Sequence, residues 1–262
     1  MTVPSGHTGA ELTRDAFLGG RIEALQPSDG PRSGMDAIFL AAAVPVTEGK
    51  DARVLEAGAG AGVASLAIAA RAPAAGITAV EIQPGLAALA RRNAQSNGFG
   101  GRFHVIEADV TAPGRAWASA GLRSESYGHV AANPPFHDPA SSRAPADGAR
   151  ARAHQAGPGE LRDWLRFCAA MAAPGGSLTL IHRPDVLDGL LEAIGGRFGA
   201  LVLFPLFPFE GKPATRLLIR GIKGSRAPLS MRRGLVLHGP DGSFTPGAEA
   251  VLRSGEALDL EG

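Results

Sequence analysis

The sequence is poor in cysteine, lysine and aromatic residues. Only one of the 262 residues is a cysteine, Cys168, so the chain cannot form an internal disulfide. Cys168 lies in an apolar helical pattern, where we expect a buried structural thiol rather than a nucleophile. Aromatic residues make up 5% of the chain and hydrophobic residues 45%, so the core must consist mainly of Ala, Leu, Val and Ile.

Long apolar runs, a leader sequence and a metal motif are also missing. No apolar run reaches the ~18 residues that a membrane helix needs. The N-terminus lacks the basic segment followed by an apolar segment that marks a signal peptide. No cluster of His, Cys and Asp has the spacing of metal ligands. With a formal net charge of +1, the sequence predicts a soluble cytoplasmic protein without a membrane anchor or a metal site.

The middle of the chain alternates short apolar runs with helical patterns. The runs predicted as strands cover residues 52–59, 76–82, 102–109, 127–134, 177–183, 200–208 and 214–224. The helical patterns cover residues 62–72, 85–98, 159–176 and 185–199, and a final helix is expected near Pro246. This alternation predicts an α/β fold with a doubly wound, mostly parallel sheet of seven strands, covered by helices on both faces.

The regular pattern predicts one main domain with short additions at both ends. We place this domain at residues 34–224, after an N-terminal extension of residues 1–33. Residues 225–262 read as a C-terminal appendage packed on the same domain. Residues 141–159 are rich in Ala, Gly, Pro and Arg with weak periodicity, so they are either a flexible loop or a segment that orders on binding.

A glycine-rich turn separates the first predicted strand from the first helix. Gly58, Gly60 and Gly62 alternate there, which allows a sharp turn and a close approach of a ligand to the backbone. The dinucleotide fingerprint needs a glycine where this chain has Val63. Glu56, just before the turn, would repel a pyrophosphate, so a ligand with a positively charged end fits better than NAD.

Two further acids end the next two predicted strands. Glu81 ends the second strand, where a carboxylate can accept hydrogen bonds from both hydroxyls of a ribose. Asp109 ends the third strand and can accept a hydrogen bond from an adenine amino group, while the backbone N–H of Val110 reaches a ring nitrogen. The three acids together predict a cleft for an adenosine that carries a cationic amino-acid tail.

The tetrad Asn133-Pro134-Pro135-Phe136 ends the fourth predicted strand. Proline has a fixed φ and no N–H to donate, so the strand must stop at a rigid corner. The side-chain carbonyl of Asn133 and the backbone carbonyl of Pro134 can each accept one N–H of an amino group and aim its lone pair. Phe136 can stack on a flat acceptor, which in base binding contributes about 1–3 kcal/mol.

These features resemble the class I S-adenosylmethionine-dependent methyltransferases over roughly residues 34–224. Residues 56–62 resemble the family's first motif, Glu81 its ribose-binding acid and Asp109 its adenine-binding acid. The resemblance implies a Rossmann-like fold and S-adenosylmethionine as the cofactor. The cofactor-binding residues that it implies are Asp36, Glu56, Gly58, Gly60, Gly62, Glu81, Ile82, Asp109, Val110 and Asn133.

The tetrad resembles the N-P-P-[YF] motif of the branch that methylates planar amino groups. Within this branch, residues 17–45 resemble the N-terminal block of bacterial valine-tRNA adenine-N6 methyltransferases, and residues 237–253 resemble their C-terminal end. His137 after Phe136 is a pairing shared with guanine-N2 ribosomal enzymes. We expect transfer to adenine N6 in tRNA. The alternatives are guanine N2 in ribosomal RNA and the glutamine amide of a protein.

A basic segment near the C-terminus suggests that the partner is RNA. Seven basic residues and no acid lie between Gly211 and Pro240, which is the charge pattern expected for phosphate binding. The residues expected to contact the substrate are Phe136, His137, Arg143, Arg232 and Arg233.

From another class, an NAD-dependent oxidoreductase would need a hydride-site His or a Tyr-Lys pair, and the sequence offers neither. A non-catalytic RNA-binding relic would carry a damaged motif, and none is visible.

Overall fold

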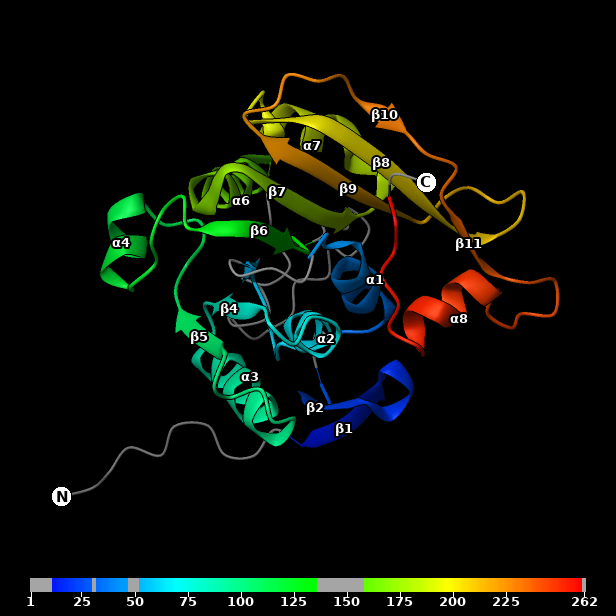
Figure 1. Cartoon of the computed structure of the whole chain (residues 1–262), viewed down its shortest axis with the longest axis horizontal. Coiled ribbons are helices and arrows are strands. Elements are labelled where there is room, and N and C mark those ends of the chain that lie inside the picture. The colour runs from blue at the N-terminus through cyan, green and yellow to red at the C-terminus, as the bar shows by residue number, and fades with distance from the viewer. Residues whose placement is uncertain (1–10, 30–31, 47–51, 136–157, 261–262) are drawn as a thin grey trace.

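A nine-stranded sheet dominates the computed structural model, which describes residues 11–29, 32–46, 52–135 and 158–260 (Figure 1). The strand order is β10-β8-β9-β7-β6-β3-β4-β5, and β11 also pairs with β8. The strands are β3 (Arg53–Ala57), β4 (Gly76–Glu81), β5 (Phe103–Glu107), β6 (Tyr127–Ala132), β7 (Ala172–His182), β8 (Phe198–Phe209), β9 (Arg216–Lys223), β10 (Ser230–Met231) and β11 (Leu235–His238).

The strand order reverses between β3 and β6. From β3 the chain adds β4 and β5 on one side, then returns to add β6 and β7 on the other. These strands are parallel to one another, whereas β9 is antiparallel to both β7 and β8. The predicted doubly wound, mostly parallel fold is therefore confirmed. The two short strands β10 and β11 extend the sheet beyond the seven strands predicted.

Helices cover both faces of the sheet. Neighbouring residues of one strand belong to different hydrophobic clusters, as Val54 and Leu55 of β3 do, because successive side chains point to opposite faces. Figure 1 shows α6 and α7 on one face and α1 and α2 on the other. The helices are α1 (Met35–Ala43), α2 (Val63–Arg71), α3 (Pro84–Ser96), α4 (Gly114–Ser119), α6 (Pro158–Met171), α7 (Leu187–Ile194) and α8 (Pro246–Leu252), with single 3₁₀ turns η1 (Leu18–Gly20) and η2 (Pro184–Val186).

Several predicted boundaries differ from the structure, and two of them differ for the same reason. The helix expected to run to residue 176 ends at Met171, because the backbone from Ala172 onward pairs with β6 as strand β7. The strand expected to end at Asp109 stops at Glu107, opposite the last residue of β4. In both places pairing with a distant strand decides the boundary, which local sequence does not reveal.

The N-terminal extension contains an antiparallel hairpin, β1 (Leu12–Phe17) and β2 (Ile22–Pro27), which the sequence did not predict. Two amide side chains, one in α3 and one at its C-terminal cap, bind the free edge of β2. Asn93 pairs with both backbone groups of Leu25, at 2.9 and 3.0 Å, and Asn97 pairs with both of Glu23, at 3.0 and 2.7 Å. These amides take the place of a neighbouring strand and fix the hairpin against α3.

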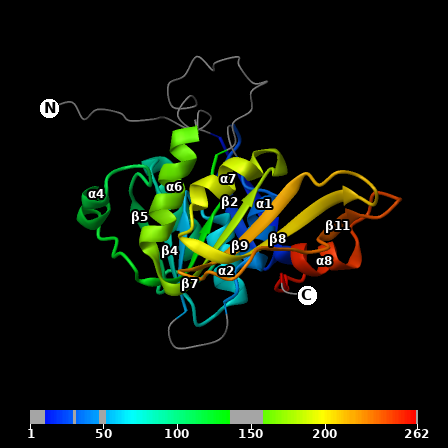
Figure 2. The same cartoon turned by 90° about the horizontal axis from the view of Figure 1, so that it is seen from above.

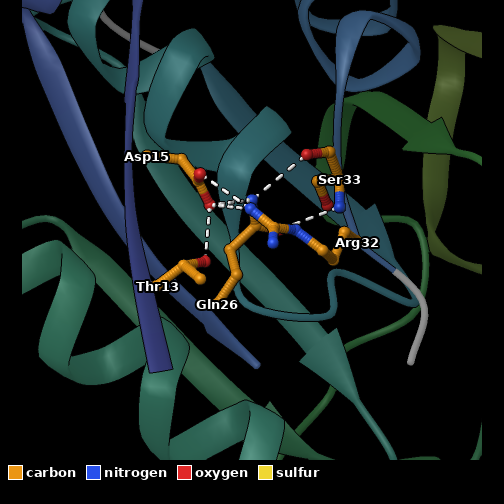
Figure 3. Close-up of polar contacts among 5 residues, drawn as sticks. All are labelled: Thr13, Asp15, Gln26, Arg32 and Ser33. Carbon is orange, nitrogen blue, oxygen red and sulfur yellow. Dashed lines mark hydrogen bonds and ion pairs between the residues drawn. The ribbon is translucent and has the colours of Figure 1, made fainter. Parts of the chain in front are cut away.

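A third amide fixes the link between β2 and α1 (Figure 3). Buried Gln26 accepts a hydrogen bond from the backbone N–H of Ser33 at 2.8 Å and donates to its carbonyl at 3.2 Å. The carboxylate of Asp15 accepts hydrogen bonds from Thr13 and Gln26 and pairs with Arg32 at 2.7 Å. The segment that leads into α1 is therefore held at a defined place against the hairpin.

The C-terminal residues pack on the edge of the same sheet. Strands β10 and β11 both run parallel to β8, and α8 contacts β11 and α1 (Figure 2). The final helix begins at Pro246, as predicted, and the hydroxyl of Thr245 caps it by accepting a hydrogen bond from the backbone N–H of Ala248 at 3.3 Å.

A buried carboxylate ties β3 to α2. Glu56 accepts hydrogen bonds from the backbone N–H of Ser65 at 2.8 Å and from its hydroxyl at 2.5 Å, close to the N-terminus of α2. Burial raises the pKa of Glu56 from 4.5 to about 7; the bonds from Ser65 lower the pKa, and the charge of Glu81 raises it further. The effect of burial is the largest, because the charged carboxylate is removed from water.

This raised pKa predicts a pH-dependent stability. Because the folded-state pKa of Glu56 lies above its ordinary value, the folded protein binds more protons than the unfolded chain between about pH 4.5 and 7. The contribution of Glu56 should therefore lower the free energy of unfolding by up to about 3 kcal/mol as pH rises through this window. Denaturant titrations of Glu56→Gln should lack this fall, with Glu192→Gln, at an exposed carboxylate, as the control. Parallel profiles for Glu56→Gln and wild type would contradict the assignment.

Candidate functional site

The ends of β3, β4 and β6 meet where the strand order reverses. Ala57 of β3 pairs with Val80 of β4 on one side and with Ala132 of β6 on the other. The next residues of β3 and β6, Gly58 and Asn133, are therefore neighbours at the carboxyl edge of the sheet. Ligands of open α/β sheets bind in the crevice at such a reversal.

The three alternating glycines lie at this edge in left-handed conformations. Gly58, Gly60 and Gly62 have φ values of 67°, 58° and 86°. A side chain at Gly58 would overlap the ring of Trp164, and one at Gly62 would lie 3.2 Å from the Cβ of Ala90. A Cβ at Gly60 would meet no atom within 4 Å. The turn is thus closely packed at two glycines and open at the middle one.

Glu81 ends β4 beside this turn, as expected. The side chain is 5% exposed, and its two oxygens accept hydrogen bonds from the backbone N–H groups of Gly60 at 2.9 Å and Gln83 at 2.8 Å. Each carboxylate oxygen has a second lone pair for a further donor. The adjacent Ile82 is 56% exposed although it is a large apolar residue, so an apolar surface lies beside the carboxylate.

Asp109 lies two residues beyond the end of β5. Its Oδ1 accepts hydrogen bonds from the backbone N–H of Thr111 at 2.7 Å and from the Thr111 hydroxyl at 2.6 Å. Its carbonyl accepts a hydrogen bond from the indole N–H of Trp117 at 3.0 Å. The following residue, Val110, is buried. This loop is therefore fixed on both its side chain and its backbone.

Asn133 immediately follows β6 and carries an unusual atom. Its Oδ1 is buried, and no donor from the described part of the chain pairs with it. Pro134 is buried, and the backbone of Pro135 hydrogen-bonds the side chain of His182. Burial lowers the pKa of His182, so this imidazole is neutral at neutral pH. The corner is rigid, and it holds an amide oxygen that no described residue pairs with.

Sequence reasoning missed two residues that shape this edge. Trp164 of α6 covers Gly58 from one face of the sheet, and Ser65 of α2 holds Glu56 from the other. Neither belongs to a motif, although a hydroxyl in the first turn of a helix after a glycine loop was a usable signal for Ser65. For Trp164 the sequence contains no local signal, because its contact crosses more than 100 residues.

Other predicted residues lie elsewhere or outside the described residues. Phe136, His137 and Arg143 fall in the segment that the structure does not describe. Asp36, in the first turn of α1, accepts a hydrogen bond from Arg216 of β9 at 2.7 Å. One oxygen of the Asp36 carboxylate is therefore already hydrogen-bonded within the protein.

The basic segment is divided by the fold. Arg216 pairs with Asp36, Lys223 pairs with Glu125 at 2.9 Å, and Arg220 is 7% exposed. The members exposed on the surface are Lys212, Arg226, Arg232 and Arg233. The seven charges therefore do not form one surface, because Arg220 is buried, and Arg216 and Lys223 are partly buried and paired with acids.

The described residues also bear on the predicted absences. Among them, no three His, Cys, Asp or Glu side chains come together in a group that could hold a metal ion. No helix in that part of the chain is long and apolar enough to cross a membrane. Cys168 is buried as predicted, and burial raises the pKa of its thiol to about 12.

Comparisons with known proteins agree on one class of enzyme. A family model described as the methyltransferase small domain matches residues 35–151. The tRNA1(Val) (adenine(37)-N6)-methyltransferase of Aeromonas hydrophila is 31% identical over 216 residues, covering 81% of this chain and 84% of that relative. The relative is therefore similar over nearly its whole length.

Solved structures show the same fold. A crystal structure from Agrobacterium tumefaciens, described as a predicted O-methyltransferase, is 34% identical with a TM-score of 0.72, covering 85% of this chain and 98% of that one. A geranyl diphosphate C-methyltransferase from Streptomyces coelicolor, solved with S-adenosyl-L-homocysteine, has a TM-score of 0.51 at 13% identity over 71% of this chain and 79% of its own, and shows the fold alone. The chain belongs to the tRNA1(Val) (adenine(37)-N6)-methyltransferase family of class I enzymes, whose cofactor is S-adenosylmethionine.

Proposed function

We propose that this protein transfers a methyl group from S-adenosylmethionine to N6 of an adenine in tRNA, in the cytoplasm. The observation that carries the proposal is the buried Oδ1 of Asn133, which has no donor among the described residues and lies beside the glycine turn. A buried acceptor without a partner costs about 1–3 kcal/mol, so its place at a ligand edge supports a donor supplied by the substrate.

The residues of the edge fit the cofactor. Open space at Gly60 lets the backbone approach a ligand, and Glu81 keeps lone pairs for the two hydroxyls of a ribose. Exposed Ile82 offers an apolar surface to the adenine, and Asp109 with the backbone N–H of Val110 would bind its edge. When bound, the cofactor supplies an electrophilic methyl group. We assign Asp36 and Glu56 supporting roles. Asp36 holds α1 through Arg216, and Glu56 holds the glycine turn through Ser65.

Asn133 and Pro134 prepare the acceptor nitrogen. The lone pair of an exocyclic amine is delocalised into its ring, which makes the amine a poor nucleophile. The side-chain carbonyl of Asn133 and the backbone carbonyl of Pro134 would each accept one of its N–H groups and direct the lone pair. Because prolines fix this corner, little ordering is required during the reaction. Once methylated, the nitrogen loses its extra proton readily, so no strong base is needed.

A nitrogen acceptor fits this corner better than an oxygen acceptor. The Agrobacterium relative is described as a predicted O-methyltransferase, and a hydroxyl group has a single proton to donate. Two carbonyl acceptors side by side match the two protons of an amino group. The name of the Aeromonas relative also supports adenine N6 rather than guanine N2 or a glutamine amide.

We assign the RNA contacts to exposed arginines beside β8. Arg232 and Arg233 are exposed beside β8, where the backbone N–H of Arg232 donates to the carbonyl of Leu203 at 2.9 Å. Three strand spacings separate β8 from β6, which is about 15 Å. We assign these arginines to phosphates next to the acceptor, and Phe136, His137 and Arg143 to the acceptor itself. Residues 34–224 would form the catalytic domain, with residues 1–33 and 225–262 as additions.

The direct test of this function is methyl transfer to unmodified tRNA. Purified protein, labelled S-adenosylmethionine and tRNA transcripts should yield label in N6-methyladenosine after digestion to nucleosides. Mass spectrometry separates this product from 2′-O-methyladenosine, because only the former keeps its methyl on the base when the glycosidic bond breaks. Label on ribose or guanine would refute the assigned acceptor, and label on protein would refute an RNA substrate.

Asn133→Ala should reduce methyl transfer at least about 100-fold, the loss typical of a group that stabilises the reacting atoms. Cofactor affinity, measured by calorimetry, should change little, because the lost oxygen faces the acceptor. Asn97→Ala removes an amide that binds β2 and should leave transfer unchanged. Equal activity of Asn133→Ala and wild type would remove Asn133 from the mechanism.

Glu81→Gln should weaken cofactor binding by about 1–3 kcal/mol, because the amide loses acceptor capacity for the ribose hydroxyls. The chain offers a matched control in Glu107, which pairs with Glu81 in register but is exposed and bonded to Arg91 at 2.7 Å. Glu107→Gln should therefore leave calorimetric affinity near that of wild type. Equal losses in the two variants would place the ribose elsewhere.

Reversing Arg232 and Arg233 to glutamate should weaken tRNA binding and flatten its salt dependence. Each lost phosphate contact removes about 0.7–0.9 from the slope of log affinity against log salt. The control reverses Arg14 and Arg92, two exposed arginines on the hairpin and α3, and changes the net charge equally. If both pairs reduce the slope alike, the effect belongs to net charge and the assigned surface is wrong.

A further inference from the structure

The two tryptophans of the described chain differ in the hydrogen bonding of their indole N–H groups. Both are buried, at 5% exposed for Trp117 and 8% for Trp164. The indole N–H of Trp117 donates to the carbonyl of Asp109 at 3.0 Å. The indole N–H of Trp164 is buried and has no acceptor among the described residues. Buried indole N–H groups usually find a partner, so this unpaired donor requires an explanation.

The ring of Trp164 packs against the glycine turn, with the edge of its six-membered ring toward Gly58. Its ring lies so close to Gly58 that a Cβ there would be 2.3 Å from the ring's Cη2 atom. Gly58 follows Ala57, whose partner in β6 is Ala132, so Gly58 and Asn133 are neighbours at the carboxyl edge. Among the described residues, Trp164 with its unpaired indole N–H and Asn133 with its unpaired oxygen therefore both lie next to Gly58, one above it in α6 and the other after the neighbouring strand β6.

An adenine can satisfy both groups at once. Its N6 amino group donates, and the ring nitrogens on either side of that group, N1 and N7, accept. A guanine presented by its N2 group has a donor, N1–H, on one side of the amine and an acceptor, N3, on the other, so it offers the indole N–H an acceptor on one side only, whereas adenine offers one on both sides. The pair formed by Trp164 and Asn133 thus matches the alternation of donor and acceptor on an adenine edge.

We propose that the indole N–H of Trp164 donates a hydrogen bond to a ring nitrogen of the acceptor adenine, which makes Trp164 a specificity-determining residue. This inference rests on the proposed function and names a contact that its motifs do not include. The expected consequence is that loss of the N–H weakens discrimination for adenine without affecting cofactor binding.

The test combines Trp164→Phe with two altered substrates. Phenylalanine keeps an aromatic ring at this position of α6 and removes the N–H. The substrates are tRNAs that carry 1-deazaadenine or 7-deazaadenine at the methylated position, each lacking one ring nitrogen. Thermal unfolding and calorimetry with the cofactor alone accompany the kinetics, so that a folding defect is recognised.

With unaltered tRNA, kcat/KM should fall about 10-fold in Trp164→Phe, the size of one lost hydrogen bond to a buried partner. With wild-type protein, kcat/KM for one of the two deaza-substrates should fall by a similar factor. For that substrate, Trp164→Phe should cause no further fall in kcat/KM. The two proteins and the two substrates form a double-mutant cycle, in which the intrinsic effect of the deaza substitution cancels. Cofactor affinity should stay within about 2-fold, far below the factor expected for a lost hydrogen bond.

Three results would overturn the proposal. If the losses in kcat/KM caused by Trp164→Phe and by the deaza substitution multiply for both deaza-substrates, Trp164 does not contact the base. A loss of cofactor affinity equal to the loss in kcat/KM would assign the N–H to the cofactor. If wild-type protein methylates no adenine in tRNA, the proposed function itself fails. Uncoupled losses with an active wild type refute only the role of Trp164.

Discussion

The arrangement of this site depends on two buried carboxylates that hold the glycine turn and the helix that follows it. Glu56 fixes the start of α2 through Ser65, and Glu81 holds the backbone N–H of Gly60 at 2.9 Å. The turn needs left-handed backbone at three alternate residues, which an unsupported loop would adopt only part of the time. Because both acids come from strand ends, the turn is positioned by the sheet rather than by its own sequence.

Around this turn, two buried polar groups lack partners in the part of the chain that the structure describes. The oxygen of Asn133 and the indole N–H of Trp164 are both buried, and neither has a partner among the described residues. A fold normally satisfies such groups, and each one left unpaired reduces stability by about 1–3 kcal/mol. Glu56 adds to this instability through its raised pKa. Such features concentrate where a substrate completes the hydrogen bonding, and this supports the proposed site.

Local patterns were sufficient to predict the fold class and the residues at the strand ends, because glycines, prolines and terminal acids act within a few residues of their own position. Contacts between distant segments were not predictable. The hairpin depends on Asn93 meeting Leu25, and the place of Trp164 depends on α6 packing over Gly58. For the basic segment, the sequence does not reveal that Arg220 is buried in the sheet or that Arg216 and Lys223 pair with acids. Burial is a property of the assembled sheet.

In the proposed reaction, the buried oxygen of Asn133 accepts a hydrogen bond from the amino group of the acceptor adenine. A crystal structure with S-adenosyl-L-homocysteine and a tRNA anticodon stem-loop tests it most directly. The account predicts the adenine N6 within about 2.7–3.2 Å of Asn133 Oδ1, the range of a hydrogen bond. An adenine bound elsewhere, with Oδ1 paired to the cofactor or to the protein, would contradict it.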